Sequence, residues 1–218
     1  MRTTRFLAPL VIGFALCLGA GTAGAAAQAS ADDETKAARA LVEHIADQAS
    51  GILKRNDKDA RQRAFRQLFE ENFNAAAIGR FVLGIHREGL DATQFDRFMA
   101  VFQELVAKTT ATRLAGYAGE KLKILEVKAL GGHWMVVSQA APQGRAPIRF
   151  EWVVARAKGG PKVVDIRVEN LSMAITERDE FAAVLQGNGG KIDGLIAFMQ
   201  DKIRVLDTEN GPRASAKP

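Results

Sequence analysis

The sequence has few of the residues that carry redox, metal or cofactor chemistry. Its one cysteine, Cys17, lies in an apolar segment near the start of the chain, and its three histidines, His44, His86 and His133, are far apart. No His-Glu-x-x-His pattern, cysteine cluster or aspartate-rich calcium loop occurs. We therefore predict no metal site, no cofactor and no disulfide framework.

Motifs for catalysis are missing as well. There is no glycine-rich phosphate loop and no nucleophile elbow. Asp165 and Glu169 lie near the end of a predicted strand, where two carboxylates could act as acid and base. A solvated strand face, with Arg167 as the ion partner, is the simpler interpretation. An NTF2-like hydrolase or isomerase would need a polar dyad inside its pocket, and we find none, so we predict that the protein is not an enzyme.

A strong excess of charge is also absent. The chain has 30 basic and 25 acidic residues, a net charge of +5, which falls to +3 if Arg2 and Arg5 are removed with a leader segment. No dense basic stripe with interleaved aromatic residues occurs, so nucleic acid is a poor candidate partner. The composition is 47% hydrophobic and 25% charged, which is typical of a globular chain with a sizeable core.

The first thing that the sequence does contain is an export signal. Two arginines precede an apolar run from Phe6 to Ala20, which is short for a membrane span, and small residues follow at 23–27. These features predict a signal peptide over residues 1–25, cleaved near residue 25, and a soluble protein of a bacterial periplasm. Leu16 before Cys17 argues against lipidation, and a retained membrane anchor is the alternative.

Helical periodicity dominates the first half of the mature chain. After a polar leader at 28–33, a helix begins at Glu34, Asp57 caps a second helix, and Ala75–Leu83 forms a short third one. A long helix starts at Asp91 or Thr93, and its apolar face is unusually aromatic: Phe95, Phe98, Met99, Phe102, Leu105 and Val106. On residue type alone, that face is ordinary packed core.

The second half changes to the alternation of β-strands. Short runs rich in β-branched and aromatic residues are separated by glycine and proline turns, which predicts a four-stranded antiparallel meander: 122–127, 134–139, 148–155 and 163–168. Helices over 172–185 and 192–206 follow. We therefore expect one α+β domain over residues 34–206, followed by a polar tail over 207–218.

Several segments, taken together and in order, resemble the MlaC / toluene-tolerance family. They are Ile78–Gly84 with the helix after it, Tyr117–Glu120, Val163–Ser172, Phe181–Leu185 and Gly194–Ile196. The likeness covers roughly Ala38 to Ile203, which is essentially the whole mature domain. The chain departs from the family pattern after Gly84, where the family has an arginine with a Tyr-Trp pair.

The resemblance implies a fold and a function. Members of the family are periplasmic phospholipid carriers that shuttle lipid between an outer-membrane lipoprotein complex and an inner-membrane ABC transporter with a lipid-binding subunit. Their fold is a helical N-terminal half packed on a curved antiparallel sheet with C-terminal helices, distantly NTF2-like, and it encloses an apolar pocket for acyl chains. A branch of the family is associated with hopanoids, so a polycyclic lipid is the alternative cargo.

On this basis we expect an aromatic helical wall opposite an apolar sheet face. The expected pocket residues are Phe81, Phe98, Phe102, Leu105, Tyr117, Val136, Ile148, Phe150, Trp152, Val164, Ile166 and Val168. Arg80 or Arg149 could meet a lipid phosphate at the pocket mouth, although a surface ion pair is the simpler role for each. A competing hypothesis is a non-catalytic module whose apolar helix face docks on a partner protein and leaves an exposed apolar patch when alone.

Overall fold

The computed structural model describes residues 22–114, 120–141 and 146–209. The contacts within the chain define two units, residues 1–34 and residues 35–218. Helix α1 begins in the first unit and ends in the second, and all the other elements belong to the second. No helix of the described residues is long and apolar enough to cross a membrane.

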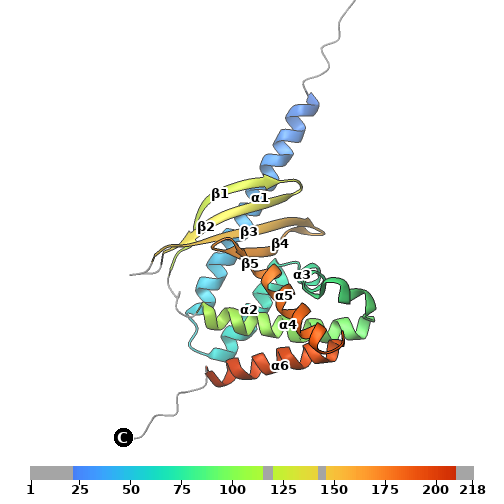
Figure 1. Cartoon of the computed structure of the whole chain (residues 1–218). Helices are drawn as coiled ribbons and strands as arrows, with labels where there is room; N and C mark the ends of the chain where they lie inside the picture. The colour runs from blue at the N-terminus through green and yellow to red at the C-terminus, as the bar shows by residue number, and fades with distance from the viewer. Residues whose placement is uncertain (1–21, 115–119, 142–145, 210–218) are drawn as a thin grey trace, which may run out of the picture. The chain divides into compact units, whose positions relative to one another are not determined.

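The elements follow the order that the sequence pattern predicts, with helices first, strands second and two further helices last (Figure 1). The helices are α1 (Thr22–Leu53), α2 (Lys58–Asn72), α3 (Ala75–Leu83), α4 (Ala92–Arg113), α5 (Met173–Gly187) and α6 (Ile192–Glu209), with a 3-10 helix, η1, at Gly84–Gly89. The strands are β1 (Lys123–Leu130), β2 (His133–Ala140), β3 (Ile148–Ala157), β4 (Gly160–Val168) and β5 (Leu171–Ser172).

Side-chain caps explain where the helices begin. The Asp57 carboxylate accepts a hydrogen bond from the Ala60 backbone N–H at 3.0 Å, as predicted. Asp91 accepts from the Gln94 N–H at 2.8 Å, and the Gln94 side chain accepts from the Asp91 N–H at 3.0 Å. This reciprocal capping box fixes the start of α4 and selects Asp91 over Thr93 as its cap.

The sheet is an antiparallel meander in the order β1-β2-β3-β4-β5. The prediction of four strands is therefore incomplete, because a two-residue fifth strand pairs with the end of β4. Glu169 and Asn170 adopt positive φ angles of 49° and 67°, which turns the chain back tightly enough for Leu171 and Ser172 to pair. Short-range turn chemistry of this kind is not visible as hydrophobic alternation.

Two helix boundaries also differ from the prediction. Helix α1 begins at Thr22 and so includes residues 28–33, which were expected to form a leader. The segment before them is rich in alanine, the best helix former, which favours continuation of the helix. Helix α6 continues to Glu209, beyond the expected end at Leu206. There, Asp207 accepts a hydrogen bond from Lys108 of α4 at 2.6 Å.

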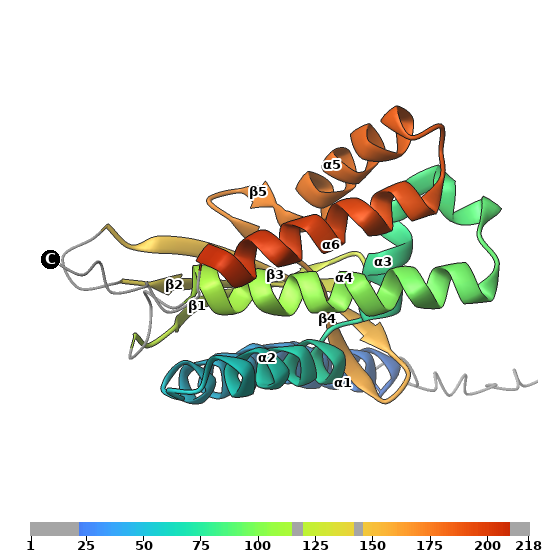
Figure 2. The same cartoon turned by 90° about the horizontal axis from the view of Figure 1, so that it is seen from below.

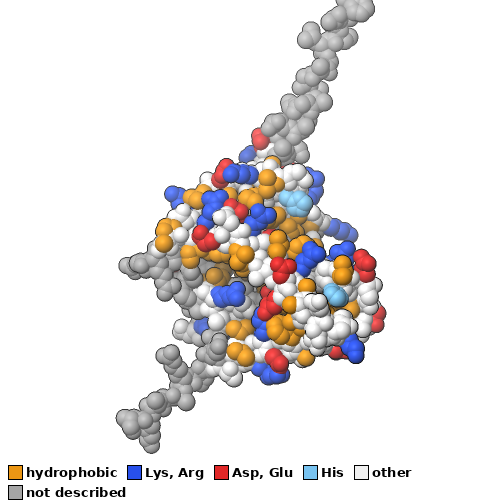
Figure 3. Space-filling view, in the orientation of Figure 1, with side chains coloured by type: hydrophobic (Ala, Val, Ile, Leu, Met, Phe, Trp, Pro, Cys, Tyr) orange, Lys and Arg blue, Asp and Glu red, His pale blue; other side chains and the backbone are white. Residues whose placement is uncertain are grey.

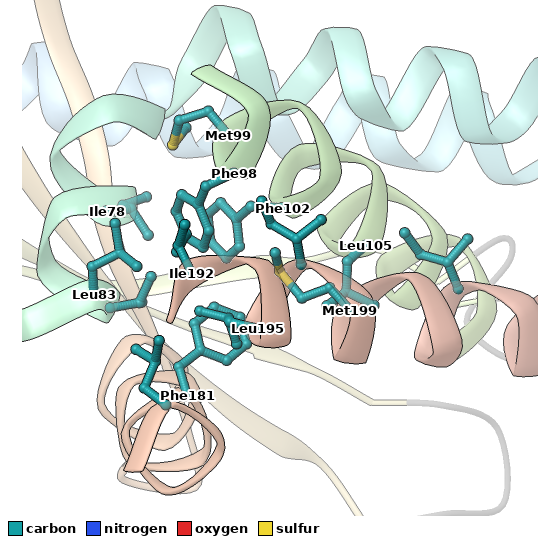
Figure 4. Packing of buried hydrophobic residues seen from close by; sticks show 14 of the residues in the cluster. Ile78, Leu83, Phe98, Met99, Phe102, Leu105, Phe181, Ile192, Leu195 and Met199 are labelled. Atoms are coloured by element: carbon teal, nitrogen blue, oxygen red, sulfur yellow. The ribbon is translucent and has the colours of Figure 1, made fainter. Parts of the chain in front are cut away.

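One core cluster joins the helices α3 to α6 (Figure 4). Phe98 and Phe102 of α4 stack with ring centroids 5.5 Å apart, and Phe181 of α5 meets both rings edge-on at 6.1 Å. Leu195 and Met199 of α6 close the cluster and are fully buried. Figure 2 shows α4 and α6 lying side by side, as this packing requires.

A second cluster packs helices against the sheet. The apolar face of β2, β3 and β4 packs against α1 and α2. The buried helical residues of this cluster include Val42, Ile45 and Ile52 of α1 and Phe65 and Leu68 of α2. The buried sheet residues in this cluster are Trp134, Val136, Trp152, Val154 and Val163. The alternation predicted for the strands thus has a physical cause, since one face of the sheet is covered by helices.

The link between α2 and α3 ties the two clusters together. Phe73 forms a parallel bridge with Val163 on the open edge of β4, and the Asn74 N–H donates to the Val163 carbonyl at 2.9 Å. Asn74 then caps α3 by accepting from the Ala77 N–H at 3.2 Å. This short connection fixes where α3 starts relative to the sheet.

Candidate functional site

An apolar cavity of about 240 Å³ lies where the two clusters meet. Its walls come from α1, α2, α3, α4, β3, β4 and α5, and they consist mainly of aromatic and branched aliphatic side chains. The lining residues are Ile45, Ala49, Phe65, Leu68, Phe69, Phe73, Ile78, Val82, Phe102, Val106, Ala107, Thr110, Leu114, Trp152, Val164, Asp165, Ile166, Met173, Ala174 and Glu177.

Helix α4 forms one wall through a stripe of residues four apart. Phe102, Val106, Thr110 and Leu114 follow one another along the cavity. Residues at this spacing lie on the same side of a helix. Phe102 belongs both to this stripe and to the helical core cluster, as Phe69, Ile78 and Val82 do on other walls of the cavity.

A β-bulge shapes the sheet wall. Val153 pairs with Asp165 and Val154 pairs with Val163, so Val164 is an extra residue in β4. Both Val164 and Ile166 then line the cavity, next to Trp152 of β3. The polar end of Trp152 is satisfied away from the apolar space, because its indole N–H donates to the Ser138 hydroxyl at 2.8 Å.

Three polar side chains interrupt the lining: Thr110, Asp165 and Glu177. Asp165 is held firmly, since it accepts hydrogen bonds from the Ser172 hydroxyl at 2.7 Å and from the Ala174 N–H at 3.0 Å. Burial raises the pKa of Glu177 above its ordinary value, and the charge of Lys202 opposes this shift.

The described residues contain no group of three or more histidine, cysteine, aspartate or glutamate side chains arranged to hold a metal ion. Asp165 and Glu169, the carboxylates considered from the sequence, have separate partners. The Glu169 carboxylate accepts a hydrogen bond from the backbone N–H of Arg149 at 2.7 Å. The Nε atom of Arg167 lies 3.9 Å from Oδ2 of Asp165. The arrangement can enclose an apolar ligand, with two carboxyl groups on its wall.

The family model described as "MlaC protein" matches residues 35–201. The chain belongs to the MlaC family. A solved structure with the same fold is that of a phospholipid-binding protein from Ralstonia solanacearum in complex with a phospholipid. The two share 22% sequence identity and a TM-score of 0.67, over 77% of this chain and 97% of that chain. No curated protein matches.

In this MlaC-family chain, four residues that the sequence placed in the pocket do line the cavity: Phe102, Trp152, Val164 and Ile166. Tyr117 lies outside the described residues, and the remaining seven predicted residues do not line the cavity. Three are buried in the clusters, Phe98, Leu105 and Val136, and three are partly buried on the sheet, Ile148, Phe150 and Val168. Phe81 is 38% exposed, with the Arg178 guanidinium 5.2 Å from its ring centroid.

The two arginines proposed for a head group also lie away from the cavity wall. The Arg80 guanidinium is 5.3 Å from the centroid of the Phe95 ring. Arg149 forms an ion pair with Glu151 at 3.0 Å, which agrees with the surface role that we considered for it.

Sequence reasoning missed the contributions of α1, α2 and α5 to the cavity, and of Ile78 and Val82 in α3. Ile45, Phe65 and Phe69 lie in periodic apolar rows, but the predicted pocket does not include them. Nothing in a single helix pattern tells whether its apolar side meets another side chain or an empty space. Met173 and Ala174 line the cavity only because Ser172 and Asp165 hold the start of α5 against β4.

Proposed function

We propose that this MlaC-family protein is a non-catalytic carrier that binds the acyl chains of a phospholipid in the cavity. In this proposal the protein is exported to the periplasm with cleavage near residue 25. It shuttles lipid between an outer-membrane lipoprotein complex and an inner-membrane ABC transporter that has a lipid-binding subunit.

The observation that carries the proposal is the almost entirely apolar lining of the cavity. Burying one methylene group is worth about 0.8 kcal/mol, so a sixteen-carbon chain exposed to water costs on the order of 12 kcal/mol. A carrier that crosses an aqueous compartment must therefore cover nearly the whole chain. Membership of the MlaC family and the phospholipid-bound structural neighbour support the same function.

The size of the cavity adds a requirement. Its volume of about 240 Å³ is below the range of roughly 300–1,000 Å³ that is typical of small-molecule pockets. In this proposal, binding of a diacyl lipid therefore requires the sheet and the helices to separate further. In Figure 3, apolar side chains reach the surface in the strip between the strands and the helices.

Native mass spectrometry of the protein purified from the cell envelope, with organic extraction of its ligand, tests the proposal. We expect a bound mass of a diacyl phospholipid and an N-terminus near residue 26. Detection of a hopanoid mass would show that the cargo is a polycyclic lipid and not a phospholipid. A protein that is empty and fails to take up added lipid would contradict the carrier function and favour a docking module.

A matched pair of variants on α4 tests the location of the ligand. Val106→Trp places a large side chain in the cavity, whereas Ala100→Trp places the same side chain on the exposed side of the helix. We expect Val106→Trp to remain folded by circular dichroism and to lose most of its bound lipid, while Ala100→Trp retains it. Equal lipid content in both variants would show that lipid binds elsewhere.

A further inference from the structure

The sheet has one long edge along which no described segment pairs. Strand β1 stands at the end of the strand order and forms the upper border of the sheet in Figure 1. The opposite edge is protected, because β4 pairs with the short β5 and carries the bridge between Phe73 and Val163. Within the described part of the chain, the backbone of β1 forms hydrogen bonds only with β2. Such an edge is a template for another strand.

The turn between β1 and β2 determines which backbone groups point to this open edge. The turn has two residues, 131–132, with φ angles of 51° and 95°. Residues that flank a turn of this kind exchange both of their backbone hydrogen bonds, and the bonding then alternates along the strands. Leu130, Lys128 and Glu126 therefore bond to β2. The N–H and C=O of Val127, between them, point to the open edge.

The side chains of β1 divide between the two faces of the sheet. Val127 packs against the cluster that joins the sheet to α1 and α2, so its neighbours in the strand lie on the other face. These neighbours, Glu126 and Lys128, lie 2.9 Å apart, and their side chains are 53% and 49% exposed. Leu125 is the extra residue of a β-bulge and is also exposed. The edge thus presents one acidic and one basic side chain, on either side of an apolar one.

One register of an antiparallel pair of β1 strands suits this arrangement. When Val127 lies opposite Val127 of a second copy, Glu126 lies opposite Lys128 of that copy, and the two-fold symmetry repeats this contact. The outward N–H and C=O groups of the two Val127 residues then exchange hydrogen bonds. A register centred on Glu126 or on Lys128 places like charges opposite each other, which is unfavourable. Charge complementarity therefore favours a second copy of this chain as the occupant of the edge.

We propose that β1 is a dimerisation edge, at which two copies of the protein pair antiparallel about Val127 and join their sheets into one. Leu125 then lies opposite Ala129 of the second copy, which covers part of an exposed apolar side chain. A contact of this size belongs to the weak and reversible class of interfaces. No residue of β1 lines the cavity, so each copy keeps its own cavity and the dimer does not depend on the carrier function.

Sedimentation equilibrium of the mature protein over a range of concentrations tests the dimer. We expect the wild type to form a reversible dimer. Glu126→Lys places lysine opposite lysine at two symmetric positions and should weaken the dimer about tenfold. Lys128→Glu should weaken it to a similar degree, because it places glutamate opposite glutamate. The double variant Glu126→Lys/Lys128→Glu restores opposite charges and should recover the association of the wild type.

Glu43→Lys is the matched control. The Glu43 side chain is 50% exposed and forms an ion pair with Arg39 at 2.9 Å, but it lies on α1 and not on β1. This variant must dimerise like the wild type. A wild type that stays monomeric at every concentration overturns the proposal. A dimer that Glu126→Lys and Glu43→Lys weaken equally, or that the double variant does not restore, also overturns it. None of these results bears on the carrier function, which is tested by bound lipid.

Discussion

Gly79 of α3 packs against side chains of α4 and leaves no room for a side chain of its own. A side-chain methyl group placed on its α-carbon would overlap the sulfur of Met99 on α4 and come within 3.5 Å of the Phe98 ring. Gly79 also belongs to the short apolar segment that resembled the family in the sequence. Its role is steric, since its absent side chain lets α3 pack against the aromatic row of α4.

Replacement of this glycine should therefore destabilise the protein. The overlap in Gly79→Ala costs about 1–3 kcal/mol. The higher helix propensity of alanine returns up to about 1 kcal/mol of that. We expect a net loss of about 0–2 kcal/mol in the free energy of unfolding, measured by urea denaturation. Gly51→Ala on α1 is the control, because nothing lies within 4 Å of its added methyl group, and it should be neutral or stabilising.

Glu177 gives a pH dependence whose sign follows from its environment. Burial raises its pKa in the folded state above the ordinary value of 4.5, so the folded protein binds this proton more tightly than the unfolded chain. The contribution of Glu177 to the free energy of unfolding is fully present below about pH 4.5. It is lost as the pH rises through the pKa that Glu177 has in the folded protein.

Glu177→Gln removes the loss of stability that follows ionisation of Glu177 at higher pH, because glutamine does not titrate. We expect a higher melting temperature than the wild type at pH 8 and no difference at pH 4, measured by circular dichroism in lipid-free protein. Asp179→Asn, which removes an exposed charge from the same helix, should show no such pH-dependent gain. A constant difference between the Glu177→Gln variant and the wild type at both pH values would contradict the pKa shift.

At the scale of elements, hydrogen bonds between β4 and the start of α5 hold part of the cavity wall in place. The Ser172 hydroxyl accepts from the Ile175 N–H at 3.1 Å and donates to Asp165 at 2.7 Å. Ser172 is thus both the cap of α5 and the connection between that helix and β4. It is 7% exposed, so water replaces its hydrogen bonds poorly.

We expect Ser172→Ala to cost about 2 kcal/mol in the free energy of unfolding, since it removes the cap and one partner of Asp165. Asp91→Ala removes the exposed cap of α4 and should cost about 1 kcal/mol. Chemical denaturation of both variants gives the comparison. A smaller loss for Ser172→Ala than for Asp91→Ala would show that the link to β4 adds no stability.

At the scale of the whole molecule, the cavity lies where the two hydrophobic clusters meet. The chain provides a natural reporter for it, because Trp152 lines the cavity and Trp134 does not. Trp134 is buried in the sheet cluster, with the Arg156 guanidinium 5.8 Å from its ring centroid.

A phospholipid with brominated acyl chains should therefore quench the fluorescence of Trp152 selectively. We expect Trp134→Phe to keep most of the quenching and Trp152→Phe to lose most of it, in titrations monitored by tryptophan emission. Comparable quenching of both variants would place the acyl chains outside this cavity.

Local sequence patterns were sufficient to predict much of the arrangement of helices and strands. Hydrophobic periodicity and capping residues predicted the order of helices and strands, the cap at Asp57 and the antiparallel meander. These features depend on neighbours within a few residues, which the sequence displays directly. Motifs in the expected order between Ile78 and Ile196 also predicted the family, which the match over residues 35–201 confirms.

The residues of the cavity wall could be predicted from the sequence only in part. Apolar residues that pack in a core and apolar residues that line a cavity have the same sequence pattern. Trp152 and Ile166 line the space, whereas Phe98, equally apolar and on the expected helix face, is packed against Phe181. The sequence by itself determined which side of each helix and strand turns away from water. Tertiary structure decided where those sides leave a gap, since the cavity walls come from helices and strands that are distant along the chain, as the bridge between Phe73 and Val163 shows.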